Sequence, residues 1–340
     1  MSPAERYRAA GVDLDALGRA KARIAQAVAG TRTELSCGLP GAFGGMVRLP
    51  ADIRDPTLVM STDGVGTKVL VALAAGTHDT VGEDLVNHCV NDILVHGARP
   101  LAFLDYIAGA DVPADTLVGL VEGVARGCRA HGMALAGGET AQMPGLYEPG
   151  HYDLAGTIVG VVAEGAALHG DRVAPGDVLL GYAASGLHTN GYSLARRILF
   201  TEQGLGLDDD VPELGGPVGD VLLRVHRSYW AAIGPVLDRV HALAHITGGG
   251  IPDNLARVLP RGRRARVRTA SWPRPGLFAY LQRAGGVSDD EMFRVFNMGV
   301  GMIAVAAARE VDAVRAAARQ AGVETWVVGE IVAGEGVEVA

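Results

Sequence analysis

The sequence predicts an α/β protein with mixed sheets and two domains. Its length, its composition and the spacing of its apolar runs support this prediction. The 340 residues exceed the usual size of one domain, and a hydrophobic share of 49% can fill more than one core. The 48 glycines recur in turns between apolar runs, and only 5% of the residues are aromatic. Such a chain is expected to fold compactly and not to remain disordered or form a fibre.

The first half alternates helical and strand-like patterns. Apolar residues recur at helical spacing in some segments, and short continuous apolar runs indicate buried strands in others. The expected elements are helices at 13–29, 84–96 and 117–128 and strands at 57–61, 101–108, 133–136 and 153–162. A glycine-bearing loop at 38–45 follows the first helix, because no regular element could contain it.

A second α/β unit is expected after the polar segment 163–176. This segment is rich in glycine and small residues, as domain boundaries often are, and a strand at 178–183 follows it. We therefore expect an N-terminal domain at 1–168 and a C-terminal domain at 169–340.

The charge of the chain argues against nucleic acid as a partner. The formal net charge is -8, which repels a polyanion, and no long basic face is evident. Arginines do cluster between 261 and 268, but they alternate within a strand-like stretch. We interpret this stretch as the solvated edge of a sheet.

Cysteine usage and hydropathy favour a cytoplasmic protein. The three cysteines include no CxxC pair, which fits a reducing compartment and neither a disulfide framework nor a zinc site. Cys128 fits core packing. The longest apolar stretches, such as 300–308, are far shorter than a membrane span. We expect no membrane partner.

Several acidic residues of the first half fall at strand ends or within apolar context. They are Asp63, Asp79, Asp92, Asp105 and Glu139. An ionised carboxylate is costly to bury alone, so such groups are usually hydrogen-bonded, paired with a cation or bound to metal. Mg²⁺ prefers oxygen ligands and commonly bridges carboxylates to substrate phosphates. The joint pattern predicts a Mg²⁺ site, although each acid alone also fits solvation or helix capping.

Two glycine-bearing segments place a carboxylate directly after a predicted strand. They are STDGVGTK at 61–68 and GGET at 137–140. The spacing of Gly64, Gly66 and Lys68 does not fit the Walker A pattern GxxxxGK[ST], which disfavours a P-loop kinase. Taken alone, the first segment is also compatible with a tight strand-to-helix turn.

The second half contains two loops suited to phosphate. The segment 185–193 precedes a helix expected at 194–200, and 247–250 precedes another helix. Backbone N–H groups at a helix start point outward with a favourable dipole and bind anions. His188 and His245 flank these loops and could donate to phosphate or act as acid or base. A turn followed by a helix cap explains either loop alone, and a lone histidine is more often structural.

At this point the residues resemble a known family, the phosphoribosylformylglycinamidine cyclo-ligases, also called aminoimidazole ribonucleotide synthetases. The resemblance covers nearly the whole chain. Its motifs are AGVD at 10–13, STDGVGTK at 61–68, HDTVG at 78–82, CVND at 89–92, FLDY at 103–106, GGETAQMPG at 137–145, YDLAG at 152–156, SGLHTNGYS at 185–193, HITGGG at 245–250 and FNMGVGM at 296–302. So many long motifs in the family's order make the resemblance specific.

The resemblance implies a two-domain fold shared with other ATP-using synthetases and kinases, and a homodimer formed through the first domain. ATP and Mg²⁺ are the implied cofactors, with K⁺ as a further candidate. The implied ATP contacts are Thr62, Gly64, Gly66, Thr67, Lys68, Asp79, Gly137, Gly138, Glu139 and Thr140. The implied contacts to the substrate are Ser185, His188, Asn190, Gly191, Ser193, Thr247, Gly248, Gly249 and Gly250.

The implied reaction is ATP-dependent ring closure of phosphoribosylformylglycinamidine in purine biosynthesis. Phosphoryl transfer to the formyl oxygen gives an iminophosphate, and the amidine nitrogen then displaces phosphate to close the ring. We assign metal roles to Asp63 and Asp92 and place His245 near the reacting phosphoryl group. Two alternatives stay open: a related kinase or synthetase acting on another amide or small acid, and a non-enzymatic assembly subunit.

Some positions depart from the family's pattern. Gly41-Ala-Phe-Gly44 and His188-Thr-Asn-Gly191 each carry one small replacement. Ala25 lies near a position where many relatives have lysine, so we assign no catalytic lysine there. His226 stands where relatives usually have threonine.

Overall fold

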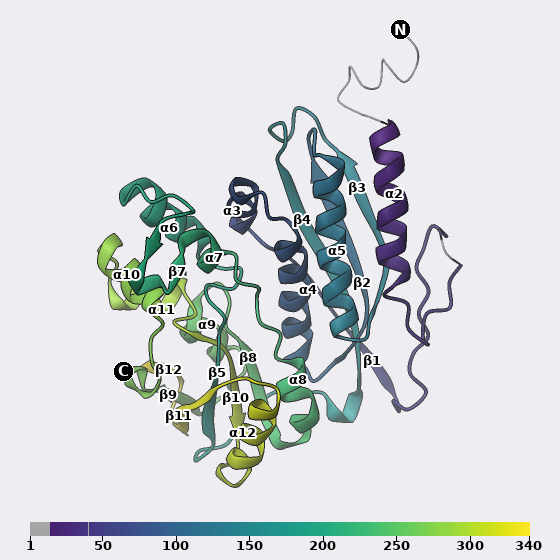
Figure 1. Cartoon of the computed structure of the whole chain (residues 1–340). Helices are drawn as coiled ribbons and strands as arrows, with labels where there is room; N and C mark the ends of the chain where they lie inside the picture. The colour runs from purple at the N-terminus through teal and green to yellow at the C-terminus, as the bar shows by residue number, and fades with distance from the viewer. Residues whose placement is uncertain (1–13, 40) are drawn as a thin grey trace. The chain divides into compact units, whose positions relative to one another are not determined.

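The computed structural model describes residues 14–39 and 41–340, which form two compact units (Figure 1). The AGVD motif at 10–13 lies outside the described residues, as does Pro40 of the glycine-bearing loop. The first unit runs to Cys89 and continues from Arg99 to Val161, and the second comprises Val90–Ala98 and Val162–Ala340. The segment 90–98, which the sequence placed in the first domain, thus belongs to the second unit.

The first unit contains a four-stranded sheet in the order β1-β4-β2-β3. Strand β2 is antiparallel to β4 and parallel to β3. The strands are β1 (Pro56–Gly64), β2 (Arg99–Gly109), β3 (Ala134–Gln142) and β4 (Tyr152–Ala163), and the helices are α2 (Leu14–Ala29), α3 (Lys68–Ala75), α4 (Asp79–Leu94) and α5 (Ala114–Ala130).

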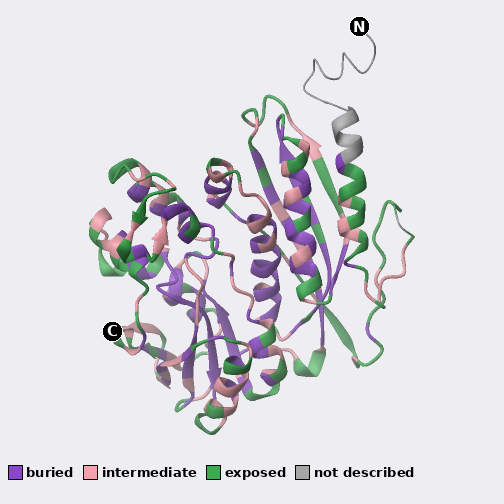
Figure 2. Cartoon of the chain, in the orientation of Figure 1, coloured by how far each residue is buried: buried purple, intermediate pink, exposed green. Residues whose placement is uncertain are grey.

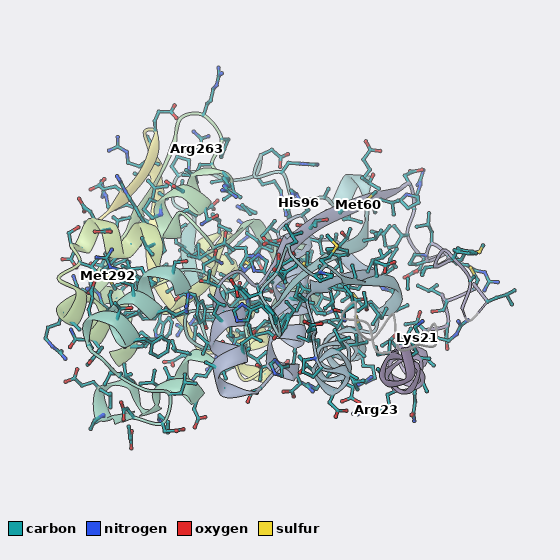
Figure 3. All side chains as sticks on the ribbon, turned by 90° about the horizontal axis from the view of Figure 1, so that it is seen from above. Lys21, Arg23, Met60, His96, Arg263 and Met292 are labelled. Carbon is teal, nitrogen blue, oxygen red and sulfur yellow. The ribbon has the colours of Figure 1, made fainter. Side chains whose placement is uncertain are left out.

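Helices pack against the sheet of the first unit. Helix α5 contacts β2 and β3, and α2 contacts α5 in turn. Arg23 of α2 pairs with Asp115 and Glu122 of α5 at 2.8 and 3.3 Å, and its side chain is labelled beside Lys21 in Figure 3. Cys128 is fully buried in α5, which confirms its predicted place in the core.

Strand β1 is more exposed than the sequence predicts. Its apolar run suggested a buried strand, but Leu58 and Met60 are 45% and 63% exposed. Much of this strand has the colour of exposed residues in Figure 2. Strand β2 alternates instead: Leu104 and Tyr106 are exposed, whereas Phe103 is buried. An apolar run indicates that the side chains of a strand are hydrophobic, but it does not show whether another layer of structure covers them. The prediction of a buried β1 was therefore wrong.

The second unit contains a six-stranded sheet in the order β12-β9-β11-β5-β10-β8. Strand β10, next to the edge strand β8, is buried at every residue and antiparallel to both neighbours. The strands are β5 (Val178–Ala183), β8 (Val240–His245), β9 (Arg263–Val267), β10 (Val300–Ala306), β11 (Thr325–Ala333) and β12 (Gly336–Val339), and β6 (Asp210–Val211) pairs with β7 (Gly216–Pro217).

Short helices connect these strands. The α-helices are α6 (Tyr192–Arg196), α7 (Val218–Leu222), α8 (Trp230–Ile233), α9 (Gly250–Ala256), α10 (Gly276–Gly285), α11 (Asp289–Val295) and α12 (Val311–Gln320). A π-helical turn covers Arg197–Glu202, and 3₁₀ turns cover Glu164–Ala166, Pro212–Leu214, Gly234–Arg239, Thr269–Ser271 and Ala308–Glu310. None of the helices among the described residues is long and apolar enough to cross a bilayer.

The core of the second unit gathers around Tyr182, Tyr229 and Met302, together with Leu94 from the end of α4. The rings of Tyr182 and Tyr229 meet edge to face with centroids 5.9 Å apart. Because Leu94 packs into this core, the last turns of α4 are anchored in the second unit.

The arginine-bearing strand β9 is not an edge strand. Strand β12 pairs with its outer side, so β9 is the second strand of the sheet. The Arg266 guanidinium lies 3.6 Å from Glu338 of β12 and 4.0 Å from Glu330 of β11. The interpretation of this stretch as an edge was wrong, because the partner strand lies much later in the chain.

Candidate functional site

The STDGVGTK segment begins as strand and then turns into α3. Strand β1 continues through Gly64, and the Thr62 hydroxyl lies 2.8 Å from the hydroxyl of Thr157 on β4. The Asp63 carboxylate accepts the backbone N–H of Gly64 at 2.7 Å and lies 2.8 Å from Nε2 of buried His88. Asp63 is 47% exposed, so its carboxylate remains accessible to solvent.

Lys68 forms a buried ion pair at the start of α3. Its side chain is fully buried, and its Nζ lies 2.7 Å from the equally buried Asp84 carboxylate. Burial lowers the pKa of the Lys68 ammonium, and the charge of Asp84 opposes that shift. The pair ties the start of α3 to α4, and the ATP contact predicted for Lys68 stays a prediction.

Asp79 begins α4 and pairs with a cation from α5. The Arg126 guanidinium lies 3.1 Å from Asp79 and 2.6 Å from Glu83. A Cβ on Gly123 would lie only 2.0 Å from the Asp79 carbonyl, so the two helices approach more closely than any side chain permits. Asp79 is thus held by an ion pair, and its side chain is about half exposed.

The GGET segment lies within β3 and not after it. Gly138, Glu139 and Thr140 are exposed, and Gly138 is paired with Asp105 of β2. A Cβ on Gly138 would lie 2.0 Å from Oδ1 of Asp105, so only glycine fits. Burial raises the pKa of Asp105 to about 6, although its own backbone N–H opposes the shift. Each of these acids of the first unit therefore has a different local environment.

Three buried imidazoles gather in the second unit. His245 ends β8, His188 precedes α6, and His226 lies between α7 and α8. The rings of His188 and His226 stack with centroids 4.0 Å apart, and the Nε2 atoms of His226 and His245 are 3.3 Å apart. The structure thus adds His226 to the two histidines that the sequence singled out.

Asp92 reaches this cluster from α4. Its Oδ1 lies 2.8 Å from Nδ1 of His245, and the two side chains are 21% and 5% exposed. The N–H on Nδ1 donates to the carboxylate, which orients the imidazole so that Nε2 points toward His226. The predicted pair of Asp92 and His245 is thus in direct contact.

Asn91 determines which nitrogen of His226 carries the proton. Its Oδ1 accepts the backbone N–H of Tyr229 at 2.9 Å, so its Nδ2 donates to the Arg227 carbonyl at 2.8 Å and to Nε2 of His226 at 3.1 Å. Nε2 of His226 is therefore an acceptor, and Nδ1 carries the proton toward the Thr189 hydroxyl at 3.3 Å.

This tautomer has a consequence for His245. Its Nε2 faces an accepting nitrogen of His226, while its Nδ1 faces the Asp92 carboxylate. The Asp92 carboxylate can only accept, so Nδ1 of His245 is the nitrogen that carries a proton there. The lone pair on Nε2 of His226 is already used by the Asn91 amide, and the Nε2 atom of His245 lies beside it at 3.3 Å.

The loop at 247–250 is shaped by glycine and held by Asn254. Gly249 and Gly250 have φ of +92° and +60°, and a Cβ on Gly250 would lie 1.8 Å from the Phe293 carbonyl. The buried Asn254 amide donates to the carbonyls of Thr247, Gly248 and Gly250 at 3.3, 3.2 and 2.8 Å. The Thr247 hydroxyl donates to Oδ1 of Asn254, so it also serves the loop's own conformation.

The loop at 185–193 is held in a similar way by Asn297. Its amide donates to the Gly186 carbonyl at 2.8 Å and accepts the N–H of Gly299 at 2.8 Å. His188 has φ of +63°, an uncommon conformation for a residue with a side chain. The Ser185 hydroxyl donates to the Val225 carbonyl at 2.6 Å, whereas Ser193 is exposed on α6.

Asn190 joins the two loops. Its Oδ1 lies 3.5 Å from the place where a Cβ of Gly248 would stand, so the loops are neighbours there. Its Nδ2 is buried and has no hydrogen-bond partner among the described residues. Buried amide donors are normally satisfied, so an acceptor from a ligand is the expected partner. Gly191, which follows it, packs against the ring of Phe296.

Several residues of these sites had no role in the sequence analysis. They are Asp84, His88, Asn91, Thr189, Asn254 and Asn297. Asn91, Thr189 and Asn297 fall inside quoted motifs, which is the one signal that could have indicated them. Asp84 pairs with Lys68 and His88 pairs with Asp63, which belong to other elements of the chain. No local spacing in the sequence reveals these pairs.

Comparisons with known proteins agree with this architecture. The family model described as AIR synthase related protein, N-terminal domain, matches residues 45–162, and the corresponding C-terminal domain model matches 174–340. Thiamine-monophosphate kinase from Stenotrophomonas maltophilia superposes with a TM-score of 0.67 at 21% identity, covering 95% of this chain and 94% of that one. HypE from E. coli gives 0.67 at 19%, covering 95% and 93%. The fold class is therefore that of AIR synthase related proteins.

Relatives found by sequence identify the family within this class. The phosphoribosylformylglycinamidine cyclo-ligase of Sorangium cellulosum is 50% identical over 330 residues, which cover 96% of this chain and 95% of that protein. The enzyme of the same name from Symbiobacterium thermophilum is 48% identical, with 97% and 95% covered. The chain belongs to the family of phosphoribosylformylglycinamidine cyclo-ligases, which confirms the resemblance inferred from the motifs.

Proposed function

We propose that this protein is a phosphoribosylformylglycinamidine cyclo-ligase that uses ATP to close the imidazole ring of its substrate in purine biosynthesis. The observation that carries the proposal is the similarity to cyclo-ligases over nearly the whole length of the chain. A structural neighbour, a HypE protein in complex with ATP, has the same fold with a TM-score of 0.61. The reaction consumes ATP and releases ADP and phosphate.

The second unit supplies the groups that would bind and orient the substrate. The loops at 185–193 and 247–250 present backbone N–H groups, which suit the ribose phosphate. The buried Nδ2 of Asn190 supplies a further donor between them. Such positioning accelerates the intramolecular attack of the amidine nitrogen on the activated carbon, because the two ends are held in reacting geometry.

His245 is the proposed stabiliser of the transferring phosphoryl group. Its ring is oriented by Asp92 and lies at the edge of the glycine loops, where a protonated Nε2 would donate to a phosphoryl oxygen in place of its contact with His226. Phosphoryl transfer develops negative charge on the phosphoryl oxygens, and preorganised positive donors lower the barrier by stabilising that charge. Transfer to the formyl oxygen makes phosphate the leaving group when the ring closes.

Mg²⁺ is the proposed metal, with carboxylates of Asp63 and Asp92 as its ligands. The fit rests on donor chemistry: each carboxylate offers oxygen atoms, and each, taken within its own unit, is partly exposed to solvent. When bound with ATP, Mg²⁺ would neutralise phosphate charge. The ATP contacts proposed from the family's motifs, Lys68 among them, remain part of this proposal, as does a requirement for K⁺.

The proposal extends to a homodimer in the cytoplasm. Apolar side chains are exposed on β1 and β2, namely Leu58, Met60, Leu104 and Tyr106, with 39–63% exposure. Exposed apolar surface of this kind favours a protein interface, and a second copy of this unit is the proposed occupant. The cysteines of the described chain are free thiols, which suits a reducing compartment.

The dimer has its own test. Met60→Lys and Leu104→Lys together place two charges on this surface, so the variant should sediment as a monomer while wild type sediments as a dimer. Arg32 and Arg48 are unsuitable control positions, because replacing one cation with another changes no charge. The matched control is Glu164→Lys with Glu213→Lys, which adds two lysines on other surfaces. A monomeric wild type would remove the homodimer from the proposal.

The function itself is tested directly. Purified protein is incubated with ATP, Mg²⁺ and phosphoribosylformylglycinamidine, and the products are measured. We expect aminoimidazole ribonucleotide and ADP to form in equal amounts. Omitting K⁺ from the same assay tests the monovalent cation. A kinase or synthetase of different specificity would instead release ADP with another amide or small acid, and a non-enzymatic subunit would not bind Mg·ATP. Either result contradicts the proposal.

A further inference from the structure

The histidine cluster of the second unit has a composition that neither phosphate binding nor Mg²⁺ requires. We propose that His188, His226 and His245 form a binding site for a borderline-soft divalent transition ion such as Zn²⁺. Their candidate ligand atoms all lie within 4.8 Å of one another, and the three side chains are buried. The inference goes beyond the proposed function and does not depend on it.

The spacing of two of these atoms suits tetrahedral coordination. The Nε2 atoms of His226 and His245 are 3.3 Å apart. Two nitrogens bound to Zn²⁺ at about 2.0–2.1 Å in a tetrahedron are separated by about 3.3–3.4 Å. An ion could therefore be held by both imidazoles with little movement of either ring.

The outer contacts of both rings leave Nε2 directed into the cluster. Nδ1 of His245 donates to Asp92 at 2.8 Å, and Nδ1 of His226 faces the Thr189 hydroxyl at 3.3 Å. A histidine that binds a metal almost always donates its other N–H to a carboxylate or another acceptor, which fixes the tautomer and strengthens the ligand. Both rings already have that arrangement.

Binding would replace existing hydrogen bonds. Nε2 of His226 now accepts from Asn91 at 3.1 Å, and Nε2 of His188 accepts the backbone N–H of Ser185 at 3.2 Å. Nε2 of His245 must be unprotonated to bind, since a ligating nitrogen offers its lone pair. We therefore expect His226 and His245 to bind first and His188 to complete the set after its ring turns.

The donor atoms decide which ion is preferred. Imidazole nitrogen suits Zn²⁺, Cu²⁺ and Ni²⁺, whereas Mg²⁺ prefers oxygen. The sequence argued against zinc only because the cysteines form no CxxC pair. His226 completes a nitrogen site that cysteine counting does not detect.

The test measures metal binding in the absence of ATP and substrate. The full-length protein, freed of metal with a chelator, is titrated with Zn²⁺ in a calorimeter and with Co²⁺ while its visible absorption is recorded. Wild type should bind one ion per chain, and Co²⁺ should give the intense absorption of tetrahedral coordination. Excess Mg²⁺ should not displace it.

The variants distinguish the cluster from other histidines. His226→Thr and His188→Gln should each weaken Zn²⁺ binding by at least about 10- to 100-fold, since losing a ligand costs no less than losing a supporting contact. The exposed His169, replaced by glutamine, is the matched control and should bind as wild type does.

Two results would overturn the site: a wild type that binds no Zn²⁺ at this stoichiometry, or variants that fold, as judged by circular dichroism, and bind with unchanged affinity. The wild-type titration decides the matter even if one variant fails to fold. Because ring closure is assayed separately with Mg²⁺, failure of the metal site leaves the proposed enzyme activity intact, and an inactive enzyme leaves the metal titration valid.

Discussion

The two ion pairs at Lys68–Asp84 and Asp92–His245 differ in burial, and the difference separates a structural role from a chemical one. Both members of the first pair are fully buried, whereas Asp92 keeps 21% of its side chain exposed. A pair sealed from solvent can hold two helices together, but it cannot meet a ligand. A pair at the border of a glycine loop can do both. The family's motifs implied an ATP contact for Lys68 and a metal role for Asp92, so both were expected near the nucleotide.

The largest effect should come from breaking the sealed pair. Lys68→Met leaves the Asp84 carboxylate buried without its cation, so we expect unfolding in urea to require about 3–5 kcal/mol less free energy. The double variant Lys68→Met/Asp84→Leu should recover most of that loss, because no charge remains buried. If Lys68→Met keeps wild-type stability but raises the KM for ATP, Lys68 contacts the nucleotide and the comparison fails.

The open pair should affect rate more than stability. Asp92→Asn removes the carboxylate that orients His245, and we expect kcat to fall about 10²- to 10³-fold, as when one preorganised electrostatic group is lost. Circular dichroism and urea unfolding should remain close to wild type. ADP release at the normal rate with phosphoribosylformylglycinamidine would contradict the role of Asp92.

Asp105 extends the comparison, because its burial should make the stability of the protein depend on pH. Burial raises the pKa of Asp105 to about 6 from its ordinary 3.8, so the folded state holds the proton more tightly than the unfolded chain does. The neutral carboxyl contributes its full stability below pH 3.8, and that contribution is lost as the pH rises through 6. Asp105→Asn cannot ionise, so above pH 7 it should be more stable than wild type by about 1–3 kcal/mol.

Urea unfolding at several pH values checks this expectation. The difference between Asp105→Asn and wild type should shrink toward pH 4, where the wild-type carboxyl is protonated in the folded state. A difference independent of pH would mean that the amide acts through packing or hydrogen bonding and not through the charge.

The smallest effect is expected at Asn190. Asn190→Ala removes one hydrogen-bond donor from the junction of the two loops, which should raise the KM for phosphoribosylformylglycinamidine about 10-fold, equivalent to about 1.4 kcal/mol. The KM for ATP should change less. The matched control is Asn297→Ala, which loosens the same loop from inside and should lower stability as well. An unchanged substrate KM would exclude Asn190 from the site.

Much of the secondary structure could be predicted because it depends on local pattern. The strand expected at 178–183 is β5, and the helices expected at 13–29 and 117–128 correspond to α2 and α5. Boundaries were less accurate: α4 begins at Asp79 and not at 84, and Gly137–Thr140 lie inside β3. These shifts arise because hydrogen bonds to neighbouring strands and helices extend an element beyond its apolar run.

The candidate site was predictable in part. The glycine loops were found from their spacing, and the structure brings Asn190 beside Gly248 and Asp92 beside His245. The acids of the first unit were expected to share one environment, but Asp63 pairs with His88 and Asp79 with Arg126. The partner of a charge is set by packing between layers, which no motif reports.

The sequence by itself determined the order of helices and strands, the glycine loops and, through its motifs, the family. These properties depend on residues close together in the chain, whose backbone preferences and periodicity act locally. Only the tertiary structure decided that Lys68 is sealed from solvent, that β1 is exposed and that Asn91 sets the tautomer of His226. Burial and hydrogen-bond partners depend on distant segments packing together, because a side chain's solvent and neighbours are supplied by the whole fold.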